Sequence, residues 1–269
     1  MHHANVGAAT LEDERHGAGE PILLIHGVLV GDLLRPLATE DSLAGRYEPI
    51  VYYRRGFAGS DAVTPPFTIG DQAADAPALL SELGVERAHV VGHSYGAAIA
   101  LQLAVDAPDS VHTLTLIEAP SVAVASAQQV VEAMGPIGAR FASGDKEGAT
   151  DDFLAAMGGA GYREPLDRLL PGAFEQAVAD SDALFTVEFP ALGEWGLSQA
   201  DATSIDAPVL RVVADNTIPW FVESDALLAE WLPTSERSTI PGAGHFSPLE
   251  KPQRVAETLA TFIAQHPMS

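Results

Sequence analysis

Short apolar runs bounded by turn residues alternate along the chain with longer stretches in which apolar residues recur at helical spacing. The short runs predict buried strands at 21–26, 48–53, 88–92, 111–117 and 209–213. The longer stretches predict helices at 68–83, 95–107, 221–231 and 248–265. Strands and helices in alternation predict an α/β fold with a mostly parallel central sheet and helices on both faces.

One long segment breaks this alternation. Residues 121–206 show helical patterns, at 127–134, 150–157 and 173–183, but no convincing strand. We therefore expect an all-helical insertion after the strand at 111–117, and a core formed by residues 1–120 and 207–269.

The bulk composition narrows the partners and the chemistry. The 269 residues carry a formal net charge of -23, which repels phosphate backbones and anionic lipid, so we expect neither a nucleic acid nor a membrane as partner. The chain has 0 cysteines, which excludes thiolate catalysis and leaves oxygen and imidazole as reactive groups. No secretory signal and no run of membrane-spanning length is present, so we expect a cytoplasmic protein.

A serine stands between two glycines where a valine-rich strand meets an alanine-rich helix. The stretch is Gly92-His-Ser-Tyr-Gly96, and the missing side chains of Gly92 and Gly96 permit a tight turn from which Ser94 projects. A strand, a sharp turn and a helix are the setting that a nucleophile elbow requires. The sequence therefore predicts Ser94 as a catalytic nucleophile.

Three further stretches, together with this one, resemble the α/β-hydrolase superfamily in the order of its motifs. They are Ile25-His-Gly-Val28, Arg54-Arg-Gly-Phe-Ala-Gly-Ser60 and the loop from Pro241 to Pro252. The resemblance implies the α/β-hydrolase fold, with 121–206 as a cap over the active site. It also implies a serine hydrolase that needs no metal and no cofactor.

A serine hydroxyl needs a base to accept its proton. Among the 9 histidines, His245 lies in a glycine-flanked loop before the last helix, in the order that the resemblance implies, whereas His2 and His3 are expected at a disordered end. The resemblance places the two oxyanion donors at the backbone amides of Val28 and Tyr95.

The acid that should orient His245 departs from the common pattern. Most superfamily members place an aspartate after the seventh strand, but the matching position here holds Thr217. Glu118, at the end of the 111–117 strand, resembles the glutamate that one subgroup of haloalkane dehalogenases and the zearalenone-type lactone hydrolases use. We therefore predict Glu118 as the acid and keep Asp215 as the alternative.

The aromatic residues of the insertion and of the catalytic loops indicate an apolar pocket for a small-molecule substrate. We expect substrate contacts at His26, Gly27, Trp195, Trp220 and Phe246. The predicted reaction is hydrolysis of a carboxylic ester or lactone through an acyl-enzyme. Carbon–carbon bond hydrolysis of diketone-like substrates and a slow-turnover ligand receptor are the alternatives, and the sequence leaves the oligomeric state and the substrate's identity open.

Overall fold

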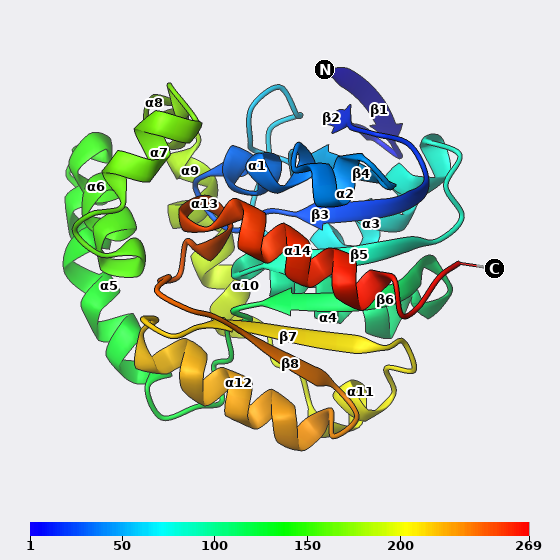
Figure 1. Ribbon diagram of the computed structural model, residues 1–269. Helices are drawn as coiled ribbons and strands as arrows, with labels where there is room; N and C mark the ends of the chain where they lie inside the picture. The colour runs from blue at the N-terminus through cyan, green and yellow to red at the C-terminus, as the bar shows by residue number, and fades with distance from the viewer. Residues whose placement is uncertain (269) are drawn as a thin grey trace.

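The computed structural model describes residues 1–268 and contains one eight-stranded sheet in the order β1-β2-β4-β3-β5-β6-β7-β8 (Figure 1). The strands are β1 (His2–Val6), β2 (Ala9–Arg15), β3 (Glu20–Ile25), β4 (Tyr47–Tyr52), β5 (Ala88–His93), β6 (Val111–Ile117), β7 (Val209–Ala214) and β8 (Glu236–Ile240). Strands β3 to β8 run parallel, and β1 and β2 pair antiparallel at one edge. The predicted α/β class with a mostly parallel sheet is confirmed.

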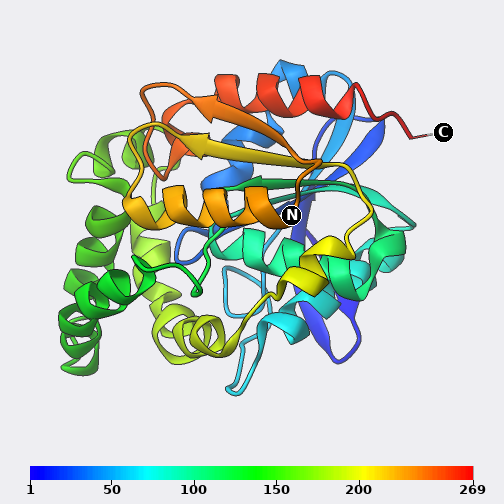
Figure 2. The same cartoon turned by 90° about the horizontal axis from the view of Figure 1, so that it is seen from below.

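Helices cover both faces of the sheet, as Figure 2 shows from below. One face carries α1 (Arg35–Ala38), α2 (Asp41–Ala44) and α14 (Pro252–Ile263), and the other carries α3 (Ile69–Glu82), α4 (Tyr95–Asp106) and α12 (Pro219–Trp231). Successive side chains of a strand point to opposite faces, so Ile22 and Leu24 join one core while Leu23 and Ile25 join the other. A strand buried on both faces is apolar throughout, which explains the short apolar runs.

Two elements at the ends of the chain differ from the prediction. His2 and His3 are not in a disordered end but in β1, where His3 pairs with Glu12 of β2. The polar residues of β1 and β2 conceal the alternation of buried and exposed positions. The helix predicted at 248–265 is divided into α13 (Ser247–Glu250) and α14, because Lys251 precedes Pro252 and has a non-helical backbone.

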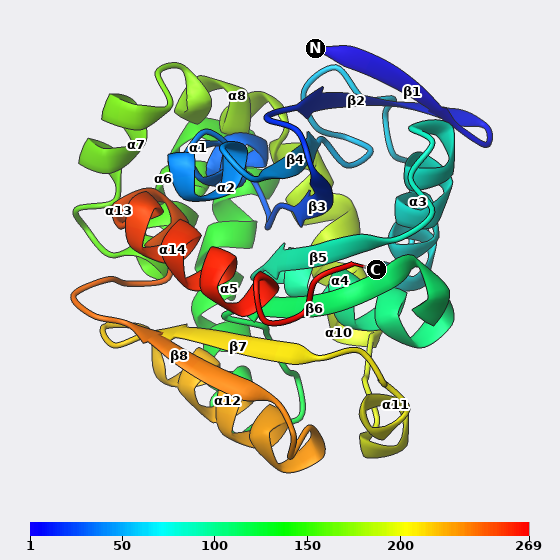
Figure 3. The same cartoon turned by 45° about the vertical axis from the view of Figure 1, so that its right-hand side comes forward.

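The segment between β6 and β7 is helical and contains no strand. Its elements are α5 (Ala127–Ala142), α6 (Lys146–Gly158), α7 (Arg163–Leu169), α8 (Ala173–Ala179), α9 (Ser181–Ala183), the π-helix η3 (Leu184–Glu188), α10 (Phe189–Glu194) and α11 (Gln199–Thr203). Figure 1 shows α5 to α8 beyond the carboxyl ends of the parallel strands, and Figure 3 shows β1 and β2 at the opposite edge of the sheet from β8. No helix within residues 1–268 has both the length and the apolar character to cross a membrane.

Candidate active site

Ser94 lies at the sharp turn between β5 and α4, with φ 54° and ψ −124°. A side chain at Gly92 would collide with the backbone of Gly96, and one at Gly96 would collide with the carbonyls of Ile25 and His26. The turn is therefore open only to glycine at these two positions. A non-glycine residue at positive φ is strained, and such strain persists where the surroundings determine the conformation.

His245 lies between Ser94 and Glu118 and contacts both. Its Nε2 is 3.0 Å from Ser94 Oγ, and its Nδ1 is 2.7 Å from Glu118 Oε2. Because a carboxylate only accepts, Nδ1 donates to Glu118, which leaves Nε2 to accept the serine hydroxyl. The buried imidazole stacks on Phe221, with ring centroids 4.0 Å apart and an interplanar angle of 7°. The ring is thus fixed both in tautomer and in orientation.

Glu118 follows the last residue of β6 at a φ of 51°, and its carboxylate is buried. Its Oε1 accepts the backbone N–H of Ala214 at 2.8 Å, and its Oε2 accepts the hydroxyl of Thr217 at 2.7 Å as well as the His245 N–H. These donors compensate for the loss of water around the charge. Thr217, at the position of the common aspartate, therefore holds the glutamate that contacts His245.

Asp215 lies on the surface in the loop after β7. Its Oδ1 accepts the backbone N–H of Gly242 at 2.7 Å, which ties this loop to the loop after β8. Among the hydrogen bonds of residues 1–268, none joins Asp215 to His245. The structure therefore brings Glu118, and not Asp215, to the imidazole.

The backbone amides of Val28 and Tyr95 lie at the two turns that flank Ser94, and all three residues line the same cavity. Within the described chain, neither amide donates a hydrogen bond to another protein group. Two free N–H groups beside a serine hydroxyl can stabilise negative charge that develops on an oxygen there.

His26 and Gly27 support this turn rather than line the cavity. The Arg54 backbone N–H donates to His26 Nε2 at 3.1 Å, so His26 carries its proton on Nδ1 and donates to the Gly27 carbonyl at 2.7 Å. Burial, with the nearby charge of Arg54, lowers the pKa of His26 well below its ordinary value. The predicted contact of these two residues with substrate is not found in the cavity wall.

His93 holds the loop that carries His245. Its Nε2 donates to the His245 carbonyl at 2.9 Å. Burial, with a smaller contribution from the charge of His245, lowers the pKa of His93 to about 3. This neutral imidazole therefore serves as a fixed donor between the elbow and the histidine loop.

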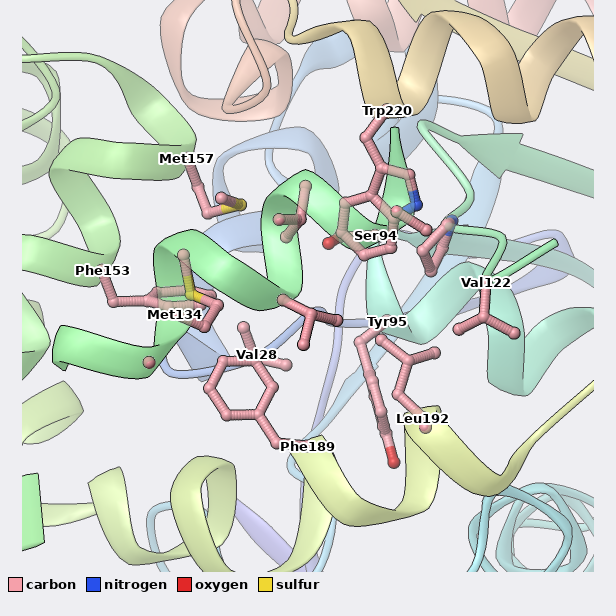
Figure 4. Close-up of a pocket in the computed structure, with 16 residues that line it drawn as sticks. Val28, Ser94, Tyr95, Val122, Met134, Phe153, Met157, Phe189, Leu192 and Trp220 are labelled. Atoms are coloured by element: carbon pink, nitrogen blue, oxygen red, sulfur yellow. The ribbon is translucent and has the colours of Figure 1, made fainter. Parts of the chain in front are cut away.

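A cavity of about 400 Å³ lies beside Ser94 (Figure 4). Much of its wall comes from the helical insertion, whose labelled residues are Val122, Met134, Phe153, Met157, Phe189 and Leu192. No charged side chain lines this cavity within the described residues. A ligand that fills it is therefore surrounded by aliphatic, thioether and aromatic groups.

The three aromatic residues predicted to contact substrate divide between cavity and core. Trp220 lines the cavity. The indole N–H of Trp195 instead donates to Gln102 Oε1 of α4 at 2.8 Å, and the ring of Phe246 packs edge-on against Tyr162, with centroids 6.5 Å apart. Trp195 and Phe246 are absent from the cavity wall because each packs between elements of the fold.

The sequence interpretation missed the aliphatic and methionine residues of the wall. On α5 the residues facing the cavity, in helical spacing, are Ala127, Val130, Val131, Met134 and Gly135. Their spacing was visible in the sequence, but an apolar helical face looks the same whether it meets a core or a cavity.

Comparisons with known proteins find similar sequences and similar solved structures. A "Putative carbamate hydrolase RutD" of Azorhizobium caulinodans is 40% identical over 118 residues, which are 44% of this chain and 44% of that protein. The matched segment thus spans less than half of that relative. A thermophilic esterase of Thermogutta terrifontis superposes with a TM-score of 0.80 at 21% identity, covering 98% of both chains. The structure of Est816, described as an N-acyl homoserine lactone degrading enzyme, gives 0.75 at 27% identity over 97% of this chain and 100% of that one.

The family model described as "Alpha/beta hydrolase family" matches residues 22–258, which include the elbow, the strand-end glutamate and the histidine loop. The predicted superfamily is thereby confirmed, and the chain belongs to the α/β-hydrolase family.

Proposed function

We propose that the protein is a serine hydrolase that cleaves a carboxylic ester or a lactone with Ser94, His245 and Glu118 as its catalytic residues. The observation that carries the proposal is the hydrogen-bonded row in which His245 lies 3.0 Å from Ser94 Oγ and 2.7 Å from Glu118 Oε2. A buried base oriented by a carboxylate is the arrangement that activates a serine hydroxyl.

The reaction proceeds in two stages. Ser94 Oγ attacks the carbonyl carbon while its proton passes to His245 Nε2, and the amides of Val28 and Tyr95 donate to the oxyanion. His245 then gives the proton to the leaving alkoxide as the bond to the carbonyl carbon breaks, which leaves an acyl-serine. In the second stage His245 takes a proton from water, hydroxide attacks the acyl carbon, and the proton returns to Ser94 as the acid departs.

The lining of the cavity supports an uncharged, apolar substrate. A charged group that entered it would lose its hydration and find no counter-charge among the described residues that line it. An ester or lactone with an aliphatic or aromatic acyl part loses no such hydration. The esterase and the lactone-degrading enzyme among the similar structures agree with this substrate class.

We also propose that residues 121–206 act as a cap that selects the substrate. Their helices supply Met134, Phe153, Met157 and Phe189 to the cavity wall opposite the elbow. The sequence of a segment that contributes to the pocket but not to the sheet can vary without disturbing Ser94, His245 and Glu118.

The proposal predicts hydrolysis by the wild-type protein on a panel of neutral esters and lactones, with loss in the Ser94→Ala variant. Without the nucleophile only binding and the oxyanion donors remain, so we expect kcat to fall by about a million-fold. Diketones in the same panel detect carbon–carbon hydrolysis. A folded wild-type protein that hydrolyses no ester or lactone, or a Ser94→Ala variant with the wild-type rate, would refute the proposal.

A further inference from the structure

The first arginine of the loop after β4 is buried beside the oxyanion turn, although Arg54 has no place in the catalytic row. Its Nη2 donates to the Gly27 carbonyl at 2.7 Å, and its Nη1 donates to Gln72 Oε1 at 2.5 Å and to Glu188 Oε1. The exposed fraction is 3% for Arg54 and 2% for Glu188. A buried pair of this kind needs an explanation, because desolvation offsets much of its attraction.

The contact at Gly27 fixes the direction of the Val28 amide. The Gly27 carbonyl and the Val28 N–H belong to one peptide unit, and this unit is trans because the only cis bond described is Pro65–Pro66. In a planar trans peptide the C=O and N–H point in opposite directions. Donation by Arg54 and His26 to the carbonyl therefore turns the Val28 N–H away from them, toward the cavity that Val28 lines.

The same guanidinium also reaches the residue that carries the second free amide. Gln72, which accepts from Arg54, donates through its Nε2 to the hydroxyl of Tyr95 at 2.7 Å. The Arg54 guanidinium carbon lies 5.1 Å from the centroid of the Tyr95 ring. One buried cation thus contacts both turns that present amides to the oxygen of a substrate.

Glu188, the anion of the pair, comes from the helical insertion rather than from the sheet. It ends the π-helix η3, and the next residue, Phe189, lines the cavity. Single π-helical turns occur often at functional sites. The segment that forms the cavity wall therefore also supplies the partner of the arginine that orients the Val28 peptide.

We propose that Arg54 and Glu188 are positioning residues that set the oxyanion donors and link them to the insertion. The proposal rests on the proposed hydrolase function. Loss of the Glu188 charge leaves Arg54 buried without its anion, so the guanidinium moves and the Gly27–Val28 peptide loses its fixed orientation. Stabilisation of the transition state should decrease more than affinity for the substrate, because the oxyanion forms only during the reaction.

The experiment compares wild type with Glu188→Gln and Arg54→Lys on a neutral ester, and measures binding of an alkylboronic acid that forms a tetrahedral adduct with Ser94. We expect kcat to fall about 10- to 100-fold in both variants, with KM within about twofold and boronate affinity reduced in parallel with kcat. Lysine keeps the charge of Arg54 but cannot reproduce its forked donation, so the second variant tests geometry without removing the cation.

Asp75→Asn is the matched control. Arg55 and Asp75 form a pair at 2.6 Å that joins the same loop to α3, the helix that carries Gln72, but it does not contact Gly27. We expect the control to keep the wild-type kcat and boronate affinity. If the Glu188→Gln variant folds and keeps the wild-type kcat and boronate affinity, the proposal is overturned, even if the melting temperature of the variant is lower. If Glu188→Gln does not fold, the same two measurements on Arg54→Lys test the proposal. Boronate binding does not depend on the preferred ester, so it tests the inference even if the hydrolysis panel fails.

Discussion

Ser94 and Glu118 both occupy positive φ, at 54° and 51°, at the ends of the adjacent strands β5 and β6. Such conformations cost about 1–3 kcal/mol each in residues other than glycine. The surroundings that maintain them are visible: Ser94 N–H donates to the Ile117 carbonyl at 2.9 Å, and Glu118 N–H donates to the Val212 carbonyl at 3.0 Å. The backbone at both strand ends is therefore held in place to present a side chain.

Replacement of the two candidate acids separates their roles. In Glu118→Gln the imidazole loses the anion that stabilises its protonated form, so we expect kcat to fall by about 1,000-fold or more. Asp215→Asn should keep kcat within about twofold, because Asp215 is exposed and bonds to Gly242 instead. Steady-state kinetics on one ester measure both. The reverse pattern would assign the acid to Asp215.

Among the elements, α5 has the largest part in forming the cavity. It faces the cavity through Val130, Val131 and Met134 while Ile137, one turn further, packs in the core. Its exposed positions include the polar residues Gln128, Glu132 and Arg140, but Val131 is exposed too. One apolar face of the helix therefore both packs in the core and lines the cavity.

Truncation at Met134 should alter the choice of acyl chain. Met134→Ala enlarges the cavity, so we expect the ratio of kcat/KM for a long-chain ester to that for a short one to rise by about 10-fold. Ile137→Ala is the control: it removes a similarly buried side chain of the same helix outside the cavity, so stability should fall while the ratio stays unchanged. Equal ratios in the two variants would contradict a role of α5 in selecting the acyl chain.

The parts predictable from sequence are those whose signal is local. The apolar run at 111–117 gave β6 at its observed bounds, and the two glycines around Ser94 gave the elbow. The edge strand β1 was not predicted because His2 and His3 interrupt the apolar pattern of the strand. Arg54 and Glu188 lie 134 positions apart, and no local pattern pairs them.

At the scale of the whole molecule, burial of neutral histidines links stability to pH. The pKa of His93 is lowered from 6.5 to about 3, and burial also lowers the pKa of His26 and of His89. Between the folded and unfolded values the unfolded chain binds protons that the folded chain does not, so the free energy of unfolding falls as pH drops below about 6.5. Raised pKa values of buried carboxyls such as Glu188 act in the opposite direction.

His93→Gln isolates one of these contributions. Glutamine retains an N–H donor but does not titrate in this range, so between about pH 7.5 and about pH 5.5 the variant should lose about 1.4 kcal/mol less unfolding free energy than wild type. Urea unfolding at the two pH values measures the difference. Parallel losses in the two proteins would show that His93 does not contribute to the acid sensitivity.

The uncharged side chains that line the cavity also affect the release of the product. Ester hydrolysis converts a neutral ligand into a carboxylate, and the described residues of the wall offer that anion no cation. The surrounding molecule has a formal net charge of -23, which repels the anion further. On the proposed reaction, the cavity therefore binds the neutral ester more tightly than the carboxylate product. The acid should dissociate at concentrations at which the ester still binds.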